Sequence, residues 1–214
     1  NVRFLIKDKL EGIGVFTYET LKRITKIHKE HHFYFLFDRK YDQDFIFSDN
    51  ITPVVIYPPA RHPILWHIWF NYSISRALKR INPDIFVSTD GFIPLKSNFK
   101  TLNVIHDIAF EHYPKDISWL ASHFYRKYFP QFAKISNRIA TVSEFSKTDI
   151  SKNYHIDQDK IDVVYNGSSS IFTPIDDHEK IKVRKQLSDG VEYFVYVGAL
   201  HSRKNISMLL KSFD

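Results

Sequence analysis

Short apolar runs alternate with longer amphipathic segments along the chain, and this alternation constrains the fold more than any other feature. Each run is a few residues long and rich in β-branched and aromatic residues, which is typical of strands buried on both faces of a parallel sheet. The predicted strands are residues 2–6, 33–37, 53–57, 85–88, 101–107, 137–143, 160–167 and 191–197. Such strands need helices on both faces of the sheet, and the intervening segments are the candidates.

The segments between the strands carry apolar residues at helical spacing. The predicted helices are residues 15–28, 64–81, 117–136, 144–154, 178–187 and 206–214. Pro63 suits the first turn of the second helix, whereas Pro130 is expected to kink or break the third. The alternation of strands and helices therefore predicts an α/β fold with a Rossmann-like, doubly wound parallel sheet.

A polar segment that contains a proline, residues 168–177, interrupts the alternation and indicates a domain boundary near residue 170. Residues 1–170 are then one Rossmann-like domain. Residues 171–214 are a linker followed by a helix, a strand and a helix, which is how a second such domain opens. Because no later strand is there to pair with residues 191–197, we expect the segment after Pro174 to be less protected from hydrogen exchange.

Composition excludes several classes of protein. With 43% hydrophobic residues the chain can bury a core, and the absence of cysteine excludes disulfides, thiolate zinc sites and cysteine nucleophiles. No apolar run reaches the length of about 18 residues that a membrane span needs. The net charge of +6 favours an anionic partner, although a lysine-rich composition explains it equally well. The one dense histidine group, residues 28–32, is interpreted as the solvated basic end of a helix rather than a metal site.

The first candidate motif is EGIGVFTYETL, in which Gly12 and Gly14 lie between a predicted strand and a helix. Glycines let backbone N–H groups approach an anion, and a helix N-terminus carries partial positive charge. Thr17 stands where a dinucleotide fingerprint needs a third glycine, which argues against a nicotinamide or flavin site. A plain tight turn explains this motif as well as an anion site does.

The second motif is VIHDIAF, which places His106 and Asp107 at the carboxyl end of a predicted strand, the edge where open parallel sheets bind ligands. A neutral histidine there can donate to a substrate hydroxyl or phosphate, with Asp107 orienting it. The alternative is a structural pair that caps a loop. No G-x-S-x-G sequence supplies a hydrolase nucleophile.

Two further motifs could hold phosphate. In NRIATVSEFSKTDI either Ser143 or Ser146 caps a predicted helix, and ordinary N-capping is favoured over phosphate binding at this helix start. In the last segment Gly198 is followed by Arg203 and Lys204, a pattern that suits a pyrophosphate but also a solvated basic loop. The absence of a Walker sequence excludes a P-loop ATPase.

Taken in order, these motifs and KIDVVYNGSSSIFTP, which contains Asn166, resemble the family 4 (group 1) glycosyltransferases of GT-B architecture. The resemblance extends from Val2 to Asp214, and VSEFSK, VVYNG and the RKN loop carry most of it. It implies two Rossmann-like domains that face a cleft, the first holding the acceptor and the second the nucleotide sugar. The family's later Glu-x7-Glu motif and final crossing helix do not occur, so the chain resembles a fragment that is inactive by itself.

The resemblance also implies roles for residues. Gly12 and Gly14 would lie at the cleft near the donor phosphates and the acceptor. His106 would lie near the transferred sugar, with Asp107 steadying its loop. Substrate would also be bound by Ser143 and Asn166. The donor phosphates would be bound by Gly198, Arg203 and Lys204. Many members carry arginine directly after the strand glycine, where this chain has Ala199, so either Arg203 supplies that charge or one phosphate contact is absent.

The implied reaction transfers a hexose, with retention, from a nucleoside-diphosphate sugar to a hydroxyl of a sugar or lipid-linked acceptor, in bacterial surface polysaccharide or glycolipid synthesis. No metal or other cofactor is expected, because cations and helix dipoles stabilise the leaving diphosphate. We expect a cytoplasmic protein with peripheral membrane contact through residues 66–70 and 118–129, which mix aromatic and basic side chains.

Two other classes of protein compete with this interpretation. A non-catalytic α/β ligand-binding domain would use the same fold, although it has no need of a second phosphate unit. A nucleic-acid-binding protein would suit the charge and the aromatic residues, but the chain has no RNP-type aromatic signature and no zinc finger.

Overall fold

The computed structural model describes residues 1–96, 98–169, 171–198, 200 and 204–213. It divides into two compact units, residues 1–166 and residues 167–214, and each is described by itself. The change of unit follows Asn166, close to residue 170, where the sequence predicts a domain boundary.

The first unit is built on parallel strands. A two-stranded sheet pairs β1 (Phe33–Phe37) with β2 (Ile51–Val55). A four-stranded sheet has the order β3-β4-β5-β6, and each neighbouring pair is parallel. Its strands are β3 (Ile85–Ser88), β4 (Lys100–Val104), β5 (Arg138–Thr141) and β6 (Ile161–Val163). The α/β, Rossmann-like fold predicted from the sequence is confirmed.

The first predicted strand, residues 2–6, is wrong. This segment turns back on itself, because the amide of Leu5 donates to the carbonyl of Val2. It nevertheless runs between the two sheets, since the amide of Val2 donates to the carbonyl of Leu36 at 3.0 Å and the Asn1 nitrogen donates to the carbonyl of Val87. The segment thus joins the two sheets without forming a regular ladder.

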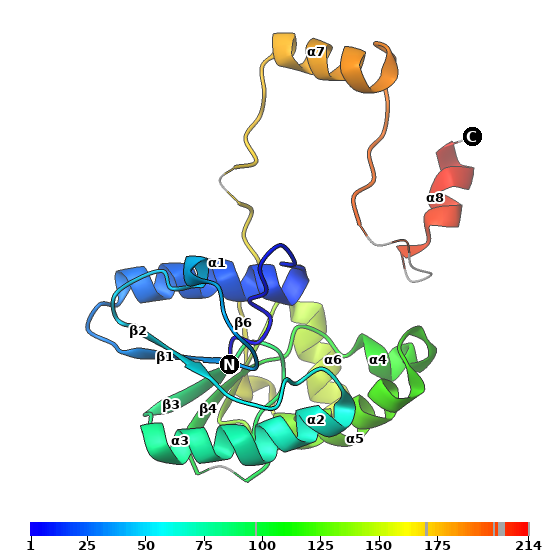
Figure 1. Cartoon of the computed structure of the whole chain (residues 1–214). Coiled ribbons are helices and arrows are strands. Elements are labelled where there is room, and N and C mark those ends of the chain that lie inside the picture. The colour runs from blue at the N-terminus through cyan, green and yellow to red at the C-terminus, as the bar shows by residue number, and fades with distance from the viewer. Residues whose placement is uncertain (97, 170, 199, 201–203, 214) are drawn as a thin grey trace. The chain divides into compact units, whose positions relative to one another are not determined.

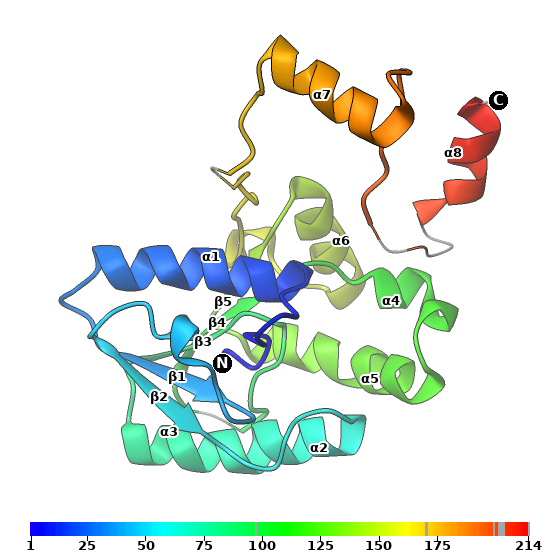
Figure 2. The ribbon, with the colours of Figure 1, turned by 45° about the horizontal axis from the view of Figure 1, so that its top comes forward.

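Helices connect the strands of the first unit. They are α1 (Gly12–Ile27), α2 (Pro63–Ile68), α3 (Ser75–Ile81), α4 (Ala109–His112), α5 (Trp119–Ile135) and α6 (Glu144–Tyr154). A π-helical stretch, η2 (Trp69–Ile74), joins α2 to α3, and short 3-10 turns form η1 (Gln43–Phe45), η3 (Pro114–Asp116) and η4 (Gln158–Lys160). In both views α1 lies on one side of the strands, and α2, α3 and α5 lie on the other (Figures 1 and 2).

The sequence predicts a kink or a break at Pro130, and the break does not occur, because α5 continues through that residue to Ile135. A proline inside a helix removes one backbone hydrogen bond, which usually costs about 3 kcal/mol or more. Phe129 on one side of the proline and Phe132 with Ala133 on the other are all buried in the core. Burial of both halves against the same sheet offsets the lost hydrogen bond and keeps the helix whole.

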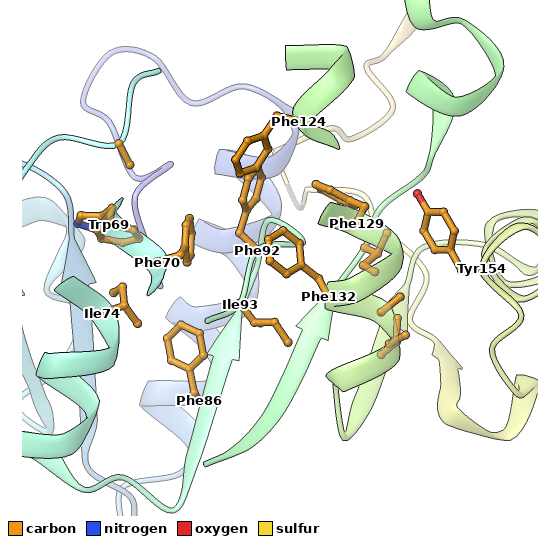
Figure 3. Packing of buried hydrophobic residues seen from close by; sticks show 14 of the residues in the cluster. Trp69, Phe70, Ile74, Phe86, Phe92, Ile93, Phe124, Phe129, Phe132 and Tyr154 are labelled. Carbon is orange, nitrogen blue, oxygen red and sulfur yellow. The ribbon is translucent and has the colours of Figure 1, made fainter. Parts of the chain in front are cut away.

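An aromatic cluster fills the space between the four-stranded sheet and the helices α2, α3 and α5 (Figure 3). Phe92 lies at its centre, with its ring centroid 5.2 Å from those of both Phe70 and Phe129. Trp69 is fully buried and donates its indole N–H to the carbonyl of Ile56. Aromatic pairs at these distances add stability beyond the area that they bury.

The second unit contains the helices α7 (Asp177–Ser188) and α8 (Ile206–Phe213). Both helices are present where the sequence predicts them. The strand predicted at residues 191–197 is wrong, because no strand occurs in the described part of this unit. A strand needs a neighbouring strand for its backbone hydrogen bonds, and the described residues of the unit offer none.

Candidate functional site

Several loops of the first unit meet at the carboxyl edge of the four-stranded sheet, and His106 lies among them. Its Nε2 is 2.9 Å from the carbonyl oxygen of Thr89, which follows β3. A carbonyl oxygen can only accept, so Nε2 carries the hydrogen. In the neutral ring Nδ1 is therefore the atom with the free lone pair, and it can accept a hydrogen bond from a ligand hydroxyl.

The His106 ring is held by more than this one bond. The edge of the Phe16 ring, from α1, meets it at a centroid distance of 4.8 Å and an angle of 89°. Thr141, at the end of β5, places its Oγ1 3.4 Å from the carbonyl oxygen of His106. The imidazole is half-buried and fixed in orientation, which is what a group that positions a substrate requires.

Thr17 ties α1 to the loop that holds His106. Its Oγ1 lies 2.7 Å from the carbonyl oxygen of Ile13 and 2.8 Å from Oγ1 of Thr89, and its side chain is fully buried. In the sequence Thr17 served only to argue against a dinucleotide fingerprint. A buried threonine facing another threonine across the sheet edge leaves no local signal, so its role was missed.

The two glycines of the first motif differ in function. A Cβ on Gly14 would lie 2.7 Å from the carbonyl oxygen of Phe4, so Gly14 is needed for α1 to pack against the N-terminal segment. Around Gly12 no described atom lies within 4 Å of such a Cβ, so this end of the helix is open. Within the described part of the chain, Glu11 makes no side-chain cap for α1, whose first-turn N–H groups carry partial positive charge, and anion binding at this turn stays a prediction.

Asp107 and Ser143 both accept hydrogen bonds from backbone amides close to them in the sequence. Oδ1 of Asp107 accepts from the amide of Ala109 at 2.9 Å, in the turn before α4, whose N-cap is Ile108. Oγ of Ser143 accepts from the amide of Ser146 at 3.1 Å and so caps α6. The capping role that the sequence favours for Ser143 is present, and substrate contacts by Asp107 and Ser143 stay predictions. Asn166, beyond β6, is exposed.

A buried ion pair beneath this edge was not foreseen from the sequence. Nε of Arg3 lies 2.5 Å from Oδ2 of Asp90, and both side chains are almost completely buried. The Arg3 guanidinium also lies over aromatic rings, 4.6 Å from the centroid of Phe92 and 4.8 Å from that of Phe4. The pair fixes Asp90, the residue next to Thr89, and so supports the loop that holds His106.

Electrostatics keep Asp90 ionised. Burial by itself would raise the pKa of its carboxyl group, but the Arg3 charge and the hydrogen bonds from Arg3, Asn1 and Ser88 outweigh burial, so the pKa lies below the usual value. The available signal was weak: a single arginine inside an apolar run, and an aspartate two residues after a strand.

The predicted donor-phosphate residues belong to the second unit. Gly198 and Lys204 are described and exposed, whereas Arg203 and Ala199 lie outside the described residues. A Cβ on Gly198 would approach the Tyr196 hydroxyl to 2.8 Å, but this hydroxyl ends an exposed side chain that can move aside, so packing does not demand a glycine here. Phosphate binding by this set stays a prediction.

A second feature of the first unit is a groove of 850 Å³ that α5 lines together with residues from α4, η3 and α6. It is basic and aromatic, and its lining includes Lys115, Trp119, His123, Arg126 and Lys127. The Trp119 side chain is 78% exposed and its ring stacks on that of His123. Among the described helices, none has the length and apolarity needed to cross a bilayer.

Comparison with known proteins identifies related sequences. Residues 10–169 match the model of a family described as Glycosyltransferase Family 4. The chain is also 30% identical over 152 residues to the O-antigen chain mannosyltransferase RfbU of Salmonella typhimurium (strain LT2). That match covers 70% of this chain but 38% of the relative, so the matched segment spans well under half of the relative's length.

Proposed function

The chain belongs to glycosyltransferase family 4, and we propose that it supplies the acceptor side of a retaining enzyme that transfers a hexose from a nucleoside-diphosphate sugar to a hydroxyl group. One observation carries this proposal: His106 is locked at the carboxyl edge of the sheet with Nε2 committed to Thr89. In parallel α/β sheets that edge is where ligands bind.

His106 has a defined task in this proposal. Because Nε2 donates to the protein, Nδ1 is left to accept a hydrogen bond from a hydroxyl of the transferred sugar. The ring is already held by Phe16, so little ordering is needed when the sugar arrives. The hydrogen bond orients the sugar so that the acceptor oxygen and the anomeric carbon meet in the right geometry.

The leaving diphosphate is the second chemical problem. Negative charge builds up on it as the bond between the sugar and the phosphate breaks, and positive groups held beside it stabilise that state more than the ground state. We assign this task to Lys204 with Arg203, from the sequence pattern of the second unit and without a metal ion. A charge-assisted hydrogen bond of this type contributes about 1.5–3 kcal/mol.

For the substrate class, the named relative is an O-antigen chain mannosyltransferase. We therefore propose a mannosyl or related hexosyl donor and a saccharide acceptor, free or lipid-linked, in surface polysaccharide or glycolipid synthesis. A lipid-linked acceptor suits a cytoplasmic enzyme that rests on the inner face of a membrane. The groove with Trp119 and its basic neighbours supports such contact, because exposed tryptophan and cations favour an anionic membrane surface.

The proposed assignment of acceptor binding to one unit and donor binding to the other bears on the activity of residues 1–214 by themselves. The acceptor-side site that we propose belongs to the first unit, whereas of the donor cations only Lys204 is described, in the second unit. We propose that residues 1–214 alone bind a saccharide but do not turn over. The prediction for Lys204 then concerns the form of the protein that also binds the donor.

The deciding experiment measures transfer from a panel of nucleoside-diphosphate hexoses in the smallest form of the protein that turns over. His106→Ala should lower kcat/KM about ten- to a hundredfold, the effect of losing one hydrogen bond to an orienting group, and should leave nucleotide binding unchanged. Lys204→Ala should weaken both donor binding and turnover. Unchanged transfer by His106→Ala would remove His106 from the site.

The competing function is a non-catalytic ligand-binding domain, and one observation favours it: Asp107 and Ser143 both accept hydrogen bonds from backbone amides of the protein itself. A binding domain predicts saccharide binding that His106→Ala weakens, with no transfer from any donor in any form of the protein. Transfer that depends on His106 decides for the enzyme.

A further inference from the structure

Three side chains converge on the turn that follows α1, far along the sequence from His106. Nδ1 of His28 lies 2.9 Å from Oε1 of Glu30, and Nε2 of His31 lies 3.8 Å from the same oxygen. All three candidate ligand atoms lie within 4.8 Å of one another, and no other such group of histidine and acidic side chains occurs in the part of the chain that the structure describes. The rings of His28 and His31 are stacked, with an angle of 28° between them.

The backbone of this turn is ordered by its own hydrogen bonds. The amide of His28 donates to the carbonyl of Ile24, and the amide of His31 donates to that of His28. The side-chain amide of Asn50 donates at 3.0 Å to the carbonyls of both His28 and His31. Three ligands on a clamped turn lose less freedom on binding than three ligands on a loose one.

We propose that His28, Glu30 and His31 form a binding site for a borderline transition-metal cation, Zn²⁺ above all, with the fourth coordination position open to solvent. Two imidazoles and a carboxylate suit zinc, whereas Mg²⁺ and Ca²⁺ prefer oxygen ligands throughout. In a tetrahedral site with bonds of about 2.0–2.2 Å, neighbouring ligand atoms lie roughly 3.3–3.5 Å apart. The separations of 2.9 and 3.8 Å lie on either side of that value, and since no pair exceeds 4.8 Å, modest side-chain rotations of these exposed residues bring all three atoms to it.

The electrostatic surroundings permit such a cation. The ligand set carries one negative charge, so the zinc complex would have a net charge of about +1. Lys29, the nearest lysine along the chain, points to Asp49, with Nζ 2.7 Å from its carboxylate. The sequence favoured a solvated basic helix end at residues 28–32, and it is the convergence of three ligand atoms on one turn that changes this interpretation.

The site lies at the opposite end of α1 from Gly12, so it is separate from the sugar chemistry. Bound zinc would tie the last turn of α1 to the segment that enters β1. A ligand that binds only the folded state stabilises it by mass action. The inference is independent of the proposed transferase function, because a chain with no activity would bind zinc equally well.

The test is calorimetric titration of the untagged chain with ZnCl₂. We expect one zinc ion per chain with a dissociation constant in the micromolar range, and a rise in melting temperature on adding zinc. Glu30→Gln and His31→Ala should each weaken binding about tenfold or more, since each removes one of three ligands. An excess of Mg²⁺ should not displace the zinc.

His32→Ala is the matched control, because His32 lies in the same segment but places its Nε2 2.9 Å from Oγ1 of Thr52 and its ring against Tyr34. It should bind zinc like the unaltered chain. Because the side chains of Glu30 and His31 are 63% and 66% exposed, their variants should fold normally, which circular dichroism would verify. Absence of zinc binding, equal binding by the Glu30→Gln/His31→Ala double variant, or displacement by Mg²⁺ would each overturn the proposal.

Discussion

Two apolar runs of similar composition adopt different structures in the two units. Residues 33–37 form β1, in which Leu36 and Phe37 are almost completely buried. Residues 191–197 form no strand, and Phe194 and Val197 are 87% and 89% exposed. The first run has a parallel neighbour in β2 and a covering helix in α1, and the described part of the second unit offers neither. An apolar run therefore becomes a buried strand only where other elements supply its hydrogen bonds and its cover.

Hydrogen exchange should show the largest contrast between the two runs. Amides of β1 and β4 are expected to exchange only by global unfolding of the first unit, whereas those of residues 191–197 should exchange almost without protection, because no ladder holds them. Native-state exchange followed by NMR gives both free energies in one experiment. Equal protection of the two segments would contradict the comparison, and a concentration series would then show whether self-association covers residues 191–197.

Matched phenylalanine substitutions should show the same contrast in stability. Phe92→Ala removes the centre of the aromatic cluster and should cost about 3–5 kcal/mol of the free energy of unfolding. Phe194→Ala removes a ring that touches only Phe213 in the described contacts, and should cost within about 0.5 kcal/mol.

Denaturant unfolding followed by tryptophan fluorescence suits this test, because all three tryptophans, at positions 66, 69 and 119, belong to the first unit. The slope of the unfolding free energy against denaturant should stay constant. The second unit has no tryptophan, so its stability is followed by native-state exchange of α7 amides, where a large loss in Phe194→Ala would mean that this unit is packed more firmly than its exposure suggests.

Much of the fold was predictable because its signals are local. The strand at 85–88 and the cap at Ser143 follow from an apolar run and from the hydrogen-bonding habits of serine. The placement of His106 at the sheet edge follows from the rule that parallel strands share a carboxyl end. Each of these inferences needs only a few neighbouring residues.

The errors and omissions all depend on distant partners. Residues 2–6 have the sequence pattern of a strand, but Arg3 forms an ion pair with Asp90, which lies far along the sequence. Thr17 meets Thr89, and Pro130 is tolerated because both halves of α5 are buried against the core. The donor-phosphate set, with Lys204 and Arg203, stays a prediction.

The Arg3–Asp90 pair gives the first unit a pH dependence that no exposed pair of the second unit should match. Its expected contribution comes from the lowered pKa of Asp90, a consequence of the Arg3 charge outweighing burial. A carboxyl group whose pKa is lower in the folded state stabilises the protein above its unfolded pKa, near 3.8, and this stabilisation disappears as the pH falls through the folded pKa.

Asp90→Asn should lower the unfolding free energy by about 3 kcal/mol at neutral pH, because it leaves the Arg3 charge buried without its partner. The difference between this variant and the unaltered chain should shrink as the pH falls below about 4. Asp177→Asn is the control, since its pair with Lys180 is exposed and surface pairs contribute about 0–1 kcal/mol. Denaturant midpoints from pH 2.5 to pH 7 provide the measurement, and a constant difference over that range would show that ionisation of Asp90 is irrelevant.

The smallest expected effect is a difference in stability between alanine variants at two glycines with similar backbone angles, and it distinguishes the cost of backbone strain from the cost of packing. Gly91 has φ of +86° and follows β3, and Gly190 has φ of +94° and follows α7. Alanine at either position meets the same left-handed strain, which costs roughly 1–2 kcal/mol. A Cβ at Gly91 would also lie 2.6 Å from the Phe129 ring, whereas around Gly190 no described atom lies within 4 Å of it.

Gly91→Ala should therefore destabilise its unit by about 1–3 kcal/mol more than Gly190→Ala destabilises its own, the usual cost of overpacking. Native-state exchange reads both units separately, with amides of β4 for the first variant and amides of α7 for the second. Equal losses would mean that the Phe129 ring moves aside without cost, and that the core of the first unit yields as readily as the exposed surface of the second.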